Sequence, residues 1–214
     1  MKQEFLNSEG SRIIYDLIKV IHDNKQYLSD IDGAIGDGDH GINMNKGFSI
    51  CEQKLKSDPG DLTHSLEILS EVLMKDIGGS MGPLYGMFFA AVADACRGKR
   101  IIDSKVFGKM LADGKESIVE IGSAKVGDKT LLDTLAPAVE AFNNSVENGN
   151  NFIQSVEDMN KAAIKGRDST KNMIAKLGRA SRLGKRSIGV IDAGAASCCL
   201  ILESMADTIE KILE

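Results

Sequence analysis

Residues 82–96, "GPLYGMFFAAVADAC", are almost wholly apolar. This run of 15 residues is too long for a buried strand and suits about four turns of helix. Pro83 falls in the predicted first turn, where a residue without a backbone N–H is tolerated. The stretch therefore predicts an almost wholly apolar helix that should be central.

On both sides of this stretch, apolar residues recur three and four positions apart, as on one face of a helix. Residues 61–77 show the pattern clearly, with Asp61 and Thr63 as helix starters and Gly78 as the stop. Strand signals are poor, because β-branched alternating runs are few. The predicted helices cover residues 9–28, 41–55, 61–77, 82–96, 104–121, 131–147, 150–172 and 194–213.

Helices joined by short connections indicate an all-α fold, an antiparallel up-and-down eight-helix bundle or barrel. No repeat, low-complexity segment or composition shift marks a boundary, so residues 1–214 are expected to form a single domain. Alternate loops of such a bundle lie at the same end. The glycine-rich loops follow the first, third, fifth and seventh helices, so they should meet there; they are residues 33–41, 78–82, 122–127 and 178–194.

The composition excludes several classes of protein. The net charge of −5 argues against a strongly cationic nucleic-acid binder. The N-terminus lacks the apolar core of a signal peptide, and no run approaches the length of a membrane span. The cysteines form no C-x-x-C pair and suit buried thiols in a reducing compartment; they are Cys51, Cys96, Cys198 and Cys199. We therefore expect a cytoplasmic protein that binds neither nucleic acid nor membrane.

Three aspartates crowd the first loop, within "SDIDGAIGDGDHGINMNKGF" at residues 29–48. Two carboxylates about 4 Å apart repel by roughly 4 kcal/mol at an effective dielectric of 20, so the group either binds a cation or splays into solvent. A calcium loop starting at Asp37 would need Glu where Phe48 stands, so the EF-hand reading fails. Hard oxygen ligands that leave room for waters and phosphate oxygens suit Mg²⁺.

Two further loops suit an anion. Residues 78–86, "GGSMGPLYG", bring glycines to a helix start, which either binds phosphate or is only a glycine cap and turn. Residues 178–187, "GRASRLGKRS", carry cations that either meet phosphate or are solvated: Arg179, Arg182, Lys185 and Arg186. With the acidic loop at the same predicted end, they describe a Mg²⁺–polyphosphate site for which a nucleotide is the natural ligand.

Four segments resemble, in order, the motifs of the DhaL family, the nucleotide-binding L subunit of phosphotransferase-system-dependent dihydroxyacetone kinase. They are "IDGAIGDGDHGINMNKGF" (31–48), "GGSMGPLYG" (78–86), "AKVGDKTLLDTLAPA" (124–138) and "GRASRLGKRSIGVIDAGAAS" (178–197). The resemblance implies an antiparallel eight-helix barrel that holds ADP or ATP and two Mg²⁺ ions at one end. It places the metal ligands at Asp32, Asp37 and Asp39, and leaves Asp30 outside the motif.

The resemblance also implies the residues that contact nucleotide. They are His40, Gly41, Ile42, Asn43, Ser80, Met81, Gly122, Leu131 or its neighbour Leu132, Arg179, Asp192, Ala193 and Gly194. Two positions depart from the family pattern, since Met81 stands where a second small residue is common and Ala193 where proline is common. We expect these departures to affect fine specificity, because the backbone N–H of Met81 is still available.

The function implied is that of a kinase subunit active only with partners. ADP would accept a phosphoryl group from the phosphohistidine of an M subunit, and the ATP formed would phosphorylate dihydroxyacetone held on a K subunit. No residue is expected to act as a catalytic base or nucleophile. The alternatives are a nucleotide-sensing regulatory module, a subunit acting on a related short ketose, and a structural loop that binds Ca²⁺ alone. A homodimer is a further alternative.

Overall fold

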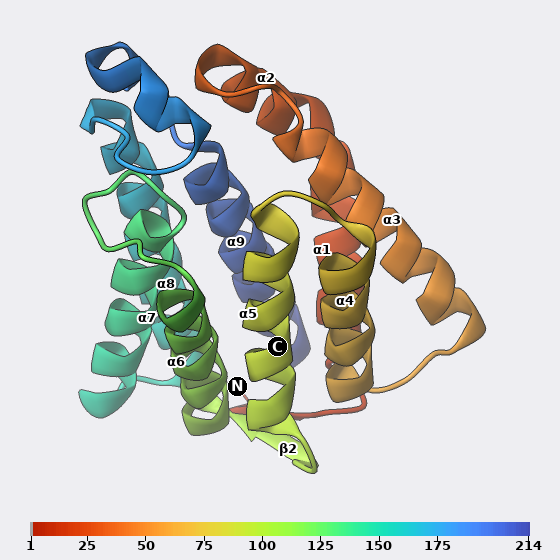
Figure 1. Ribbon diagram of the computed structural model, residues 1–214. Coiled ribbons are helices and arrows are strands. Elements are labelled where there is room, and N and C mark those ends of the chain that lie inside the picture. The colour runs from red at the N-terminus through yellow and green to blue at the C-terminus, as the bar shows by residue number, and fades with distance from the viewer. Residues whose placement is uncertain (1) are drawn as a thin grey trace.

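The computed structural model describes residues 2–214. Those residues form nine α-helices, two 3₁₀ segments and one two-stranded sheet (Figure 1). The α-helices are α1 (Ser11–Asp23), α2 (Lys25–Ile35), α3 (His40–Ser57), α4 (Leu62–Asp76), α5 (Met81–Cys96), α6 (Ser104–Ile121), α7 (Leu132–Glu147), α8 (Phe152–Ser169) and α9 (Ala193–Leu213). The other elements are β1 (Glu4–Leu6), β2 (Ile101–Asp103), η1 (Thr170–Asn172) and η2 (Arg179–Ser187).

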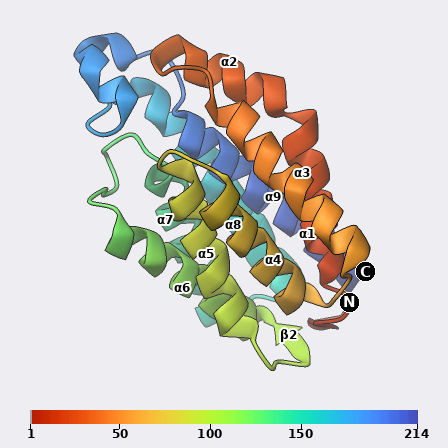
Figure 2. The same cartoon turned by 45° about the vertical axis from the view of Figure 1, so that its right-hand side comes forward.

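The helices close into a ring. From α3 to α9 each helix packs on the next in sequence, and α9 packs back on α1 and α2, which contact α3. The turned view in Figure 2 shows the same arrangement of long helices, with the chain termini near one end. The predicted all-α antiparallel barrel is confirmed, with α1 and α2 together in the place of the first predicted helix.

The first predicted helix, residues 9–28, is wrong in its course. Asn24 ends α1 and starts α2, with φ −104° and ψ 8°, and its side-chain amide donates to the Val20 carbonyl at 2.9 Å. An asparagine side chain that bonds the backbone competes with the helix in this way. The chain then runs on as α2 to Ile35, so Asp32 and Gly33 lie on a helix and the loop begins later than predicted.

The apolar helix α5 was expected to be central, and this is wrong. It is a wall of the ring between α4 and α6, with Pro83 and Met87 exposed. Its glycines allow close approach to α4: the Ser70 hydroxyl donates to the Gly86 carbonyl at 2.8 Å. The predicted burial of the cysteines is confirmed, since all four are buried free thiols.

The end of the ring opposite the glycine loops is closed by the sheet and by an aromatic cluster. β1 pairs antiparallel with β2, so that Phe5 faces Ile102. The ring of Phe152 lies 6.3 Å from Phe5, 5.7 Å from Phe107 and 6.0 Å from Phe142. These short strands were not predicted, because three residues are too few to show alternation. No helix in residues 2–214 is both long and apolar enough to traverse a bilayer.

Candidate nucleotide and metal site

The four glycine-rich loops meet at one end of the barrel, as their order predicted. They surround a cavity of about 570 Å³ lined from all four loops and from α2. Four helices, α3, α5, α7 and α9, begin there, and their first residues line the cavity: His40, Met81, Leu132 and Ala193. Since each helix start carries about half a positive charge and free N–H groups, this end attracts anions.

The predicted metal ligands lie together on one side of the cavity. Asp32 is in the last turn of α2, and Asp37 and Asp39 follow in the connection to α3. Each offers a carboxylate oxygen, and these oxygens all lie within 4.8 Å of one another. Gly38, with φ +79°, provides the left-handed turn between the two loop carboxylates.

The electrostatics of this acidic cluster favour a bound cation. Partial burial, and next the charge of Asp37, raise the pKa of the Asp39 carboxyl. The backbone N–H of His40 donates to the Asp32 carboxylate at 3.2 Å. A group of oxygen ligands without His or Cys fits a hard divalent cation such as Mg²⁺ better than Zn²⁺.

Arg179 brings the basic loop to the acidic cluster. Its guanidinium Nη1 lies 2.6 Å from the Asp37 carboxylate, although the side chain is 63% exposed. Such an exposed pair contributes little to stability, so its consequence is the placement of a cation beside the cluster. The other cations of the predicted basic loop do not line the cavity within the described chain; they are Arg182, Lys185 and Arg186.

His40 is oriented by two residues that the sequence did not single out. Its Nε2 lies 2.9 Å from the Ser197 hydroxyl of α9, which lies 2.7 Å from the Tyr85 hydroxyl of α5. Burial lowers the pKa of His40 despite the opposing charge of Asp32, and burial raises that of Tyr85 well above its usual value. The chain of hydrogen bonds therefore links the starts of α3, α5 and α9.

Asp192 lines the cavity but its carboxylate is engaged. It accepts from the backbone N–H of Ala195 at 2.8 Å and so caps α9. Burial raises the pKa of Asp192 to about 6, against the Ala195 hydrogen bond, which lowers it. A second carboxylate, that of Asp133, holds the preceding loop. It accepts hydrogen bonds from the backbone N–H of Gly127 at 2.5 Å and of Thr130 at 2.7 Å. The sequence pattern did not reveal either of these local roles.

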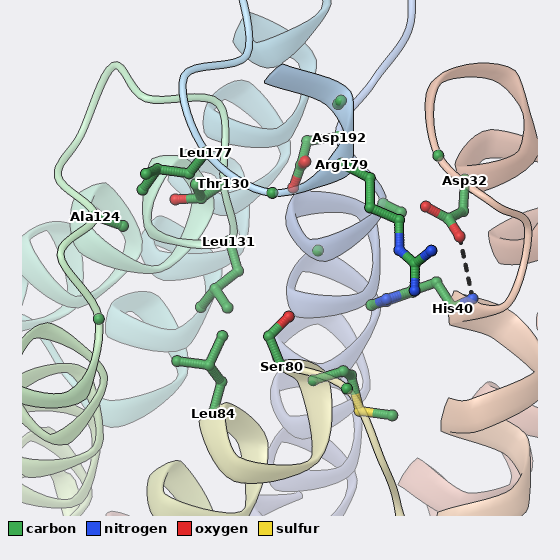
Figure 3. Close-up of a pocket in the computed structure, with 18 of the residues that line it drawn as sticks. Asp32, His40, Ser80, Leu84, Ala124, Thr130, Leu131, Leu177, Arg179 and Asp192 are labelled. Carbon is green, nitrogen blue, oxygen red and sulfur yellow. Dashed lines mark hydrogen bonds between the residues drawn. The ribbon is translucent and has the colours of Figure 1, made fainter. Parts of the chain in front are cut away.

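The other side of the cavity is apolar. Figure 3 shows Leu84, Leu131, Leu177 and Ala124 on the side away from Asp32, His40 and Arg179. Ile118, Ile121 and Gly122 also line the cavity. A flat, weakly polar ring such as a nucleobase fits this half, while a polyphosphate fits the other.

Most of the predicted nucleotide contacts line the cavity. They are His40, Asn43, Ser80, Met81, Gly122, Leu131, Arg179, Asp192, Ala193 and Gly194. Gly41 and Ile42 do not. Gly41 is buried against α2, where an added Cβ would collide with the Lys25 carbonyl, and the side chain of Ile42 is largely exposed. Gly41 therefore sets the approach of α3 to α2.

Comparison with known proteins gives a consistent family. The model described as "DAK2 domain" matches residues 34–207. The Escherichia coli (strain K12) protein "PEP-dependent dihydroxyacetone kinase, ADP-binding subunit DhaL" is 36% identical over 182 residues, covering 85% of this chain and 87% of that protein. "PEP-dependent dihydroxyacetone kinase 1, ADP-binding subunit DhaL" of Listeria innocua is 36% identical over 198 residues, covering 92% and 94%.

A solved structure shares the fold. It is the dihydroxyacetone kinase from C. freundii in complex with AMP-PNP and Mg²⁺, with a TM-score of 0.71 and 21% identity. The match covers 97% of this chain but 35% of that one, so the present chain spans about a third of that kinase. At this identity, the likeness concerns the fold alone.

Proposed function

The chain belongs to the DAK2 domain family, and from this premise we propose that it is the ADP-binding phosphotransferase subunit of a phosphoenolpyruvate-dependent dihydroxyacetone kinase. The observation that carries the proposal is a single cavity with two chemically distinct halves. One half contains three carboxylates and the N-terminal ends of helices, and the other half is apolar. Relatives matched over nearly their whole length are described as ADP-binding subunits of this kinase, which supports the same ligand.

Asp32, Asp37 and Asp39 are proposed to hold magnesium, as two ions by resemblance to the family. Their oxygen-only donor set and mutual crowding support that assignment. Bound magnesium supplies neutralisation of the phosphate charge. The protein's own contribution is to hold one carboxylate in the last turn of α2 close to two in the connection between α2 and α3.

The remaining polar groups are proposed to position the polyphosphate. They are His40 and Asn43 at the start of α3, Ser80 and the Met81 N–H at the start of α5, Arg179 of the basic loop, and Asp192, Ala193 and Gly194 at the start of α9. Gly122 and Leu131 would border the nucleoside. Phosphoryl transfer depends mainly on positioning and charge stabilisation, which this arrangement can supply. We assign no general base, and Asp192, whose pKa burial raises to about 6, is engaged as a helix cap.

The proposed reaction needs two partners. A phosphohistidine-carrying M subunit donates a phosphoryl group to ADP held here, and dihydroxyacetone on a K subunit then accepts it. The acceptor hydroxyl is held elsewhere, so this subunit alone should not phosphorylate the ketose. We further propose a cytoplasmic location, where phosphoenolpyruvate and these partners occur, and keep a homodimer as an alternative assembly.

Two measurements test the proposal. Mass spectrometry of the purified protein should find copurified ADP or ATP. Mixing the protein with K and M subunits, phosphoenolpyruvate, the general phosphotransferase proteins and dihydroxyacetone should form dihydroxyacetone phosphate, and omission of this chain is the control. Bound nucleotide without product from any matched pair of partners would favour a nucleotide-sensing module instead. If product forms from a related short ketose and not from dihydroxyacetone, that ketose is the substrate.

A further inference from the structure

Lys129 is a buried lysine in the wall of the nucleotide cavity. The residue is 1% exposed, and its backbone φ is +62°, a left-handed conformation that lysine rarely adopts. The Asp133 carboxylate accepts hydrogen bonds from the backbone N–H of Thr130, the next residue, and of Gly127, two residues before. A strained residue persists where its surroundings over-determine it, and such residues concentrate at functional sites.

A lysine at this place suggests a phosphate ligand, but its donors are engaged. The ammonium carries three N–H groups. They face three backbone carbonyls, those of Ser187 and Val190 at 2.6 Å each and that of Met173 at 3.4 Å. No N–H is left for a ligand without breaking one of these bonds. The Lys129 ammonium therefore binds backbone carbonyls of the protein, not a ligand.

The three carbonyls belong to one loop, residues 173–190, at the place where its two ends come together. We call this place the neck of the loop. Met173 precedes the segment that carries Arg179, and Ser187 and Val190 follow it. Two further bonds cross the same neck, from the Ala175 N–H to the Ser187 hydroxyl at 2.9 Å and from the Gly189 N–H to the Lys171 carbonyl at 2.8 Å. Lys129 therefore joins this neck to the loop between α6 and α7.

Building on the proposed function, we propose that Lys129 is a positioning residue: it pins the neck of residues 173–190 and thereby holds Arg179 at the polyphosphate half of the cavity. Figure 3 shows Arg179 reaching from that loop toward His40 and Asp32. The Arg179 guanidinium is exposed, and its one ion pair within residues 2–214 is with Asp37; such an exposed pair does not fix the loop. The hydrogen bonds at the neck therefore hold the loop, and with it Arg179, in place.

The first test measures the loop itself, without nucleotide. In Lys129→Met, hydrogen exchange of amides in residues 173–190 should become about tenfold faster or more, equivalent to about 1.4 kcal/mol of opening free energy. Exchange in α4, α5 and α9 should stay as in the wild type. Lys125→Met, at an exposed lysine of the same loop between α6 and α7, is the matched control and should exchange normally. Unchanged exchange in Lys129→Met would overturn the proposal.

Ser187→Ala provides a second variant that leaves Lys129 in place. It removes the hydroxyl that accepts from Ala175 at the neck, and Ser187 does not line the cavity. It should also speed exchange in residues 173–190 and weaken binding of Mg²⁺·ADP in calorimetry. Faster exchange with unaltered ADP affinity in both neck variants would show that the neck does not position the site.

A double-mutant cycle separates positioning from direct contact. If Lys129 acts through Arg179, Lys129→Met weakens ADP binding about tenfold in the wild type and much less when Arg179→Gln is already present. If the loss of ADP affinity in the double variant equals the product of the two single losses, Lys129 acts independently of Arg179 and the proposal is overturned. If the wild type binds no ADP, the proposed function fails, while the exchange measurements still decide whether Lys129 pins the loop.

Discussion

Asp37 belongs to two interactions at once. It is one of the three crowded carboxylates, and it also pairs with Arg179 at 2.6 Å. The first interaction disfavours the negative charge and the second favours it. Because the ion pair is exposed, its loss costs at most about 1 kcal/mol of folding stability. The stability of the fold therefore does not account for an aspartate at this position, whereas the proposed magnesium site does.

Asp37→Asn should separate retention of nucleotide from stability. We expect affinity for ADP in Mg²⁺ to fall at least 10–100-fold, roughly the loss seen when even an indirect metal partner is removed. The free energy of unfolding without ligand should change by less than about 1 kcal/mol. Calorimetry and urea denaturation measure the two effects. Asp30→Asn is the control, since Asp30 is exposed and accepts a hydrogen bond from the Gln26 side chain. Unchanged ADP content in Asp37→Asn would count against the metal assignment.

Asp192 should make stability depend on pH. Its pKa in the folded chain is about 6, above the ordinary 3.8, so its stabilising contribution is complete below the lower value and is lost as pH rises through the higher one. Asp192→Asn keeps a residue that caps helices well but removes the titration. The variant should therefore gain stability relative to the wild type between about pH 4 and about pH 7. Urea denaturation without nucleotide at both pH values measures the difference, and a constant difference would contradict the assignment.

At the residue scale, sequence reasoning found the groups that are close in the chain. Asp32, Asp37 and Asp39 lie within eight positions of one another, so their short spacing made a shared cation one of two readings, and the structure brings their oxygens within 4.8 Å. Tyr85 and Ser197 are 112 positions apart, and Lys129 and Val190 are 61 apart. No local pattern pairs such residues, because their contact exists only once the helices have closed the ring.

At the scale of the helix, most boundaries followed from caps and periodicity. The 104–121 prediction matches α6, which starts after Asp103, whose carboxylate accepts from the Val106 N–H at 2.8 Å. The break at Asn24 was missed because the apolar positions of α1 do not stop there clearly. Helix α2 is the consequence that matters for the site, since it supplies Asp32 from a regular turn instead of a loop.

Two glycines at the α2–α3 junction give opposite predictions. A Cβ at Gly41 would collide with the Lys25 carbonyl and lie 2.7 Å from the Ser29 nitrogen, whereas one at Gly33 meets nothing nearer than Gly38 Cα at 3.8 Å. Gly41→Ala should destabilise the chain by about 1–3 kcal/mol through overpacking. Gly33→Ala, in a helix, should stabilise it by about 0.5–1 kcal/mol. Urea denaturation compares them, and equal effects would contradict the close approach of α3 to α2.

At the scale of the whole molecule, the order of the loops predicted where the site lies. Antiparallel helices joined by short connections return alternate loops to one end, so the acidic, glycine and basic loops had to meet. Closure of the ring by α9 against α1 and α2 completes that end and brings Asp192, Ala193 and Gly194 to the cavity that the acidic cluster also lines. The order of the loops could not predict the hydrogen bonds that join one loop to another, because these depend on buried side chains such as Lys129 and Asp133.

Because the ligand would bridge loops from all around the ring, its binding should stabilise the whole molecule. At a free Mg²⁺·ADP concentration of 100 times Kd, linkage adds about 2.7 kcal/mol to the free energy of unfolding. For a chain of this length that corresponds to a rise in Tm of about 5–10 °C. Adding a chelator such as EDTA should remove most of the rise, because polyphosphate and carboxylates then repel each other. Adenosine with Mg²⁺ should give a much smaller shift than ADP, since it reaches only the apolar half. A shift with ADP that survives the chelator would contradict the role of the carboxylates, and an equal shift with adenosine would contradict the role of the helix starts.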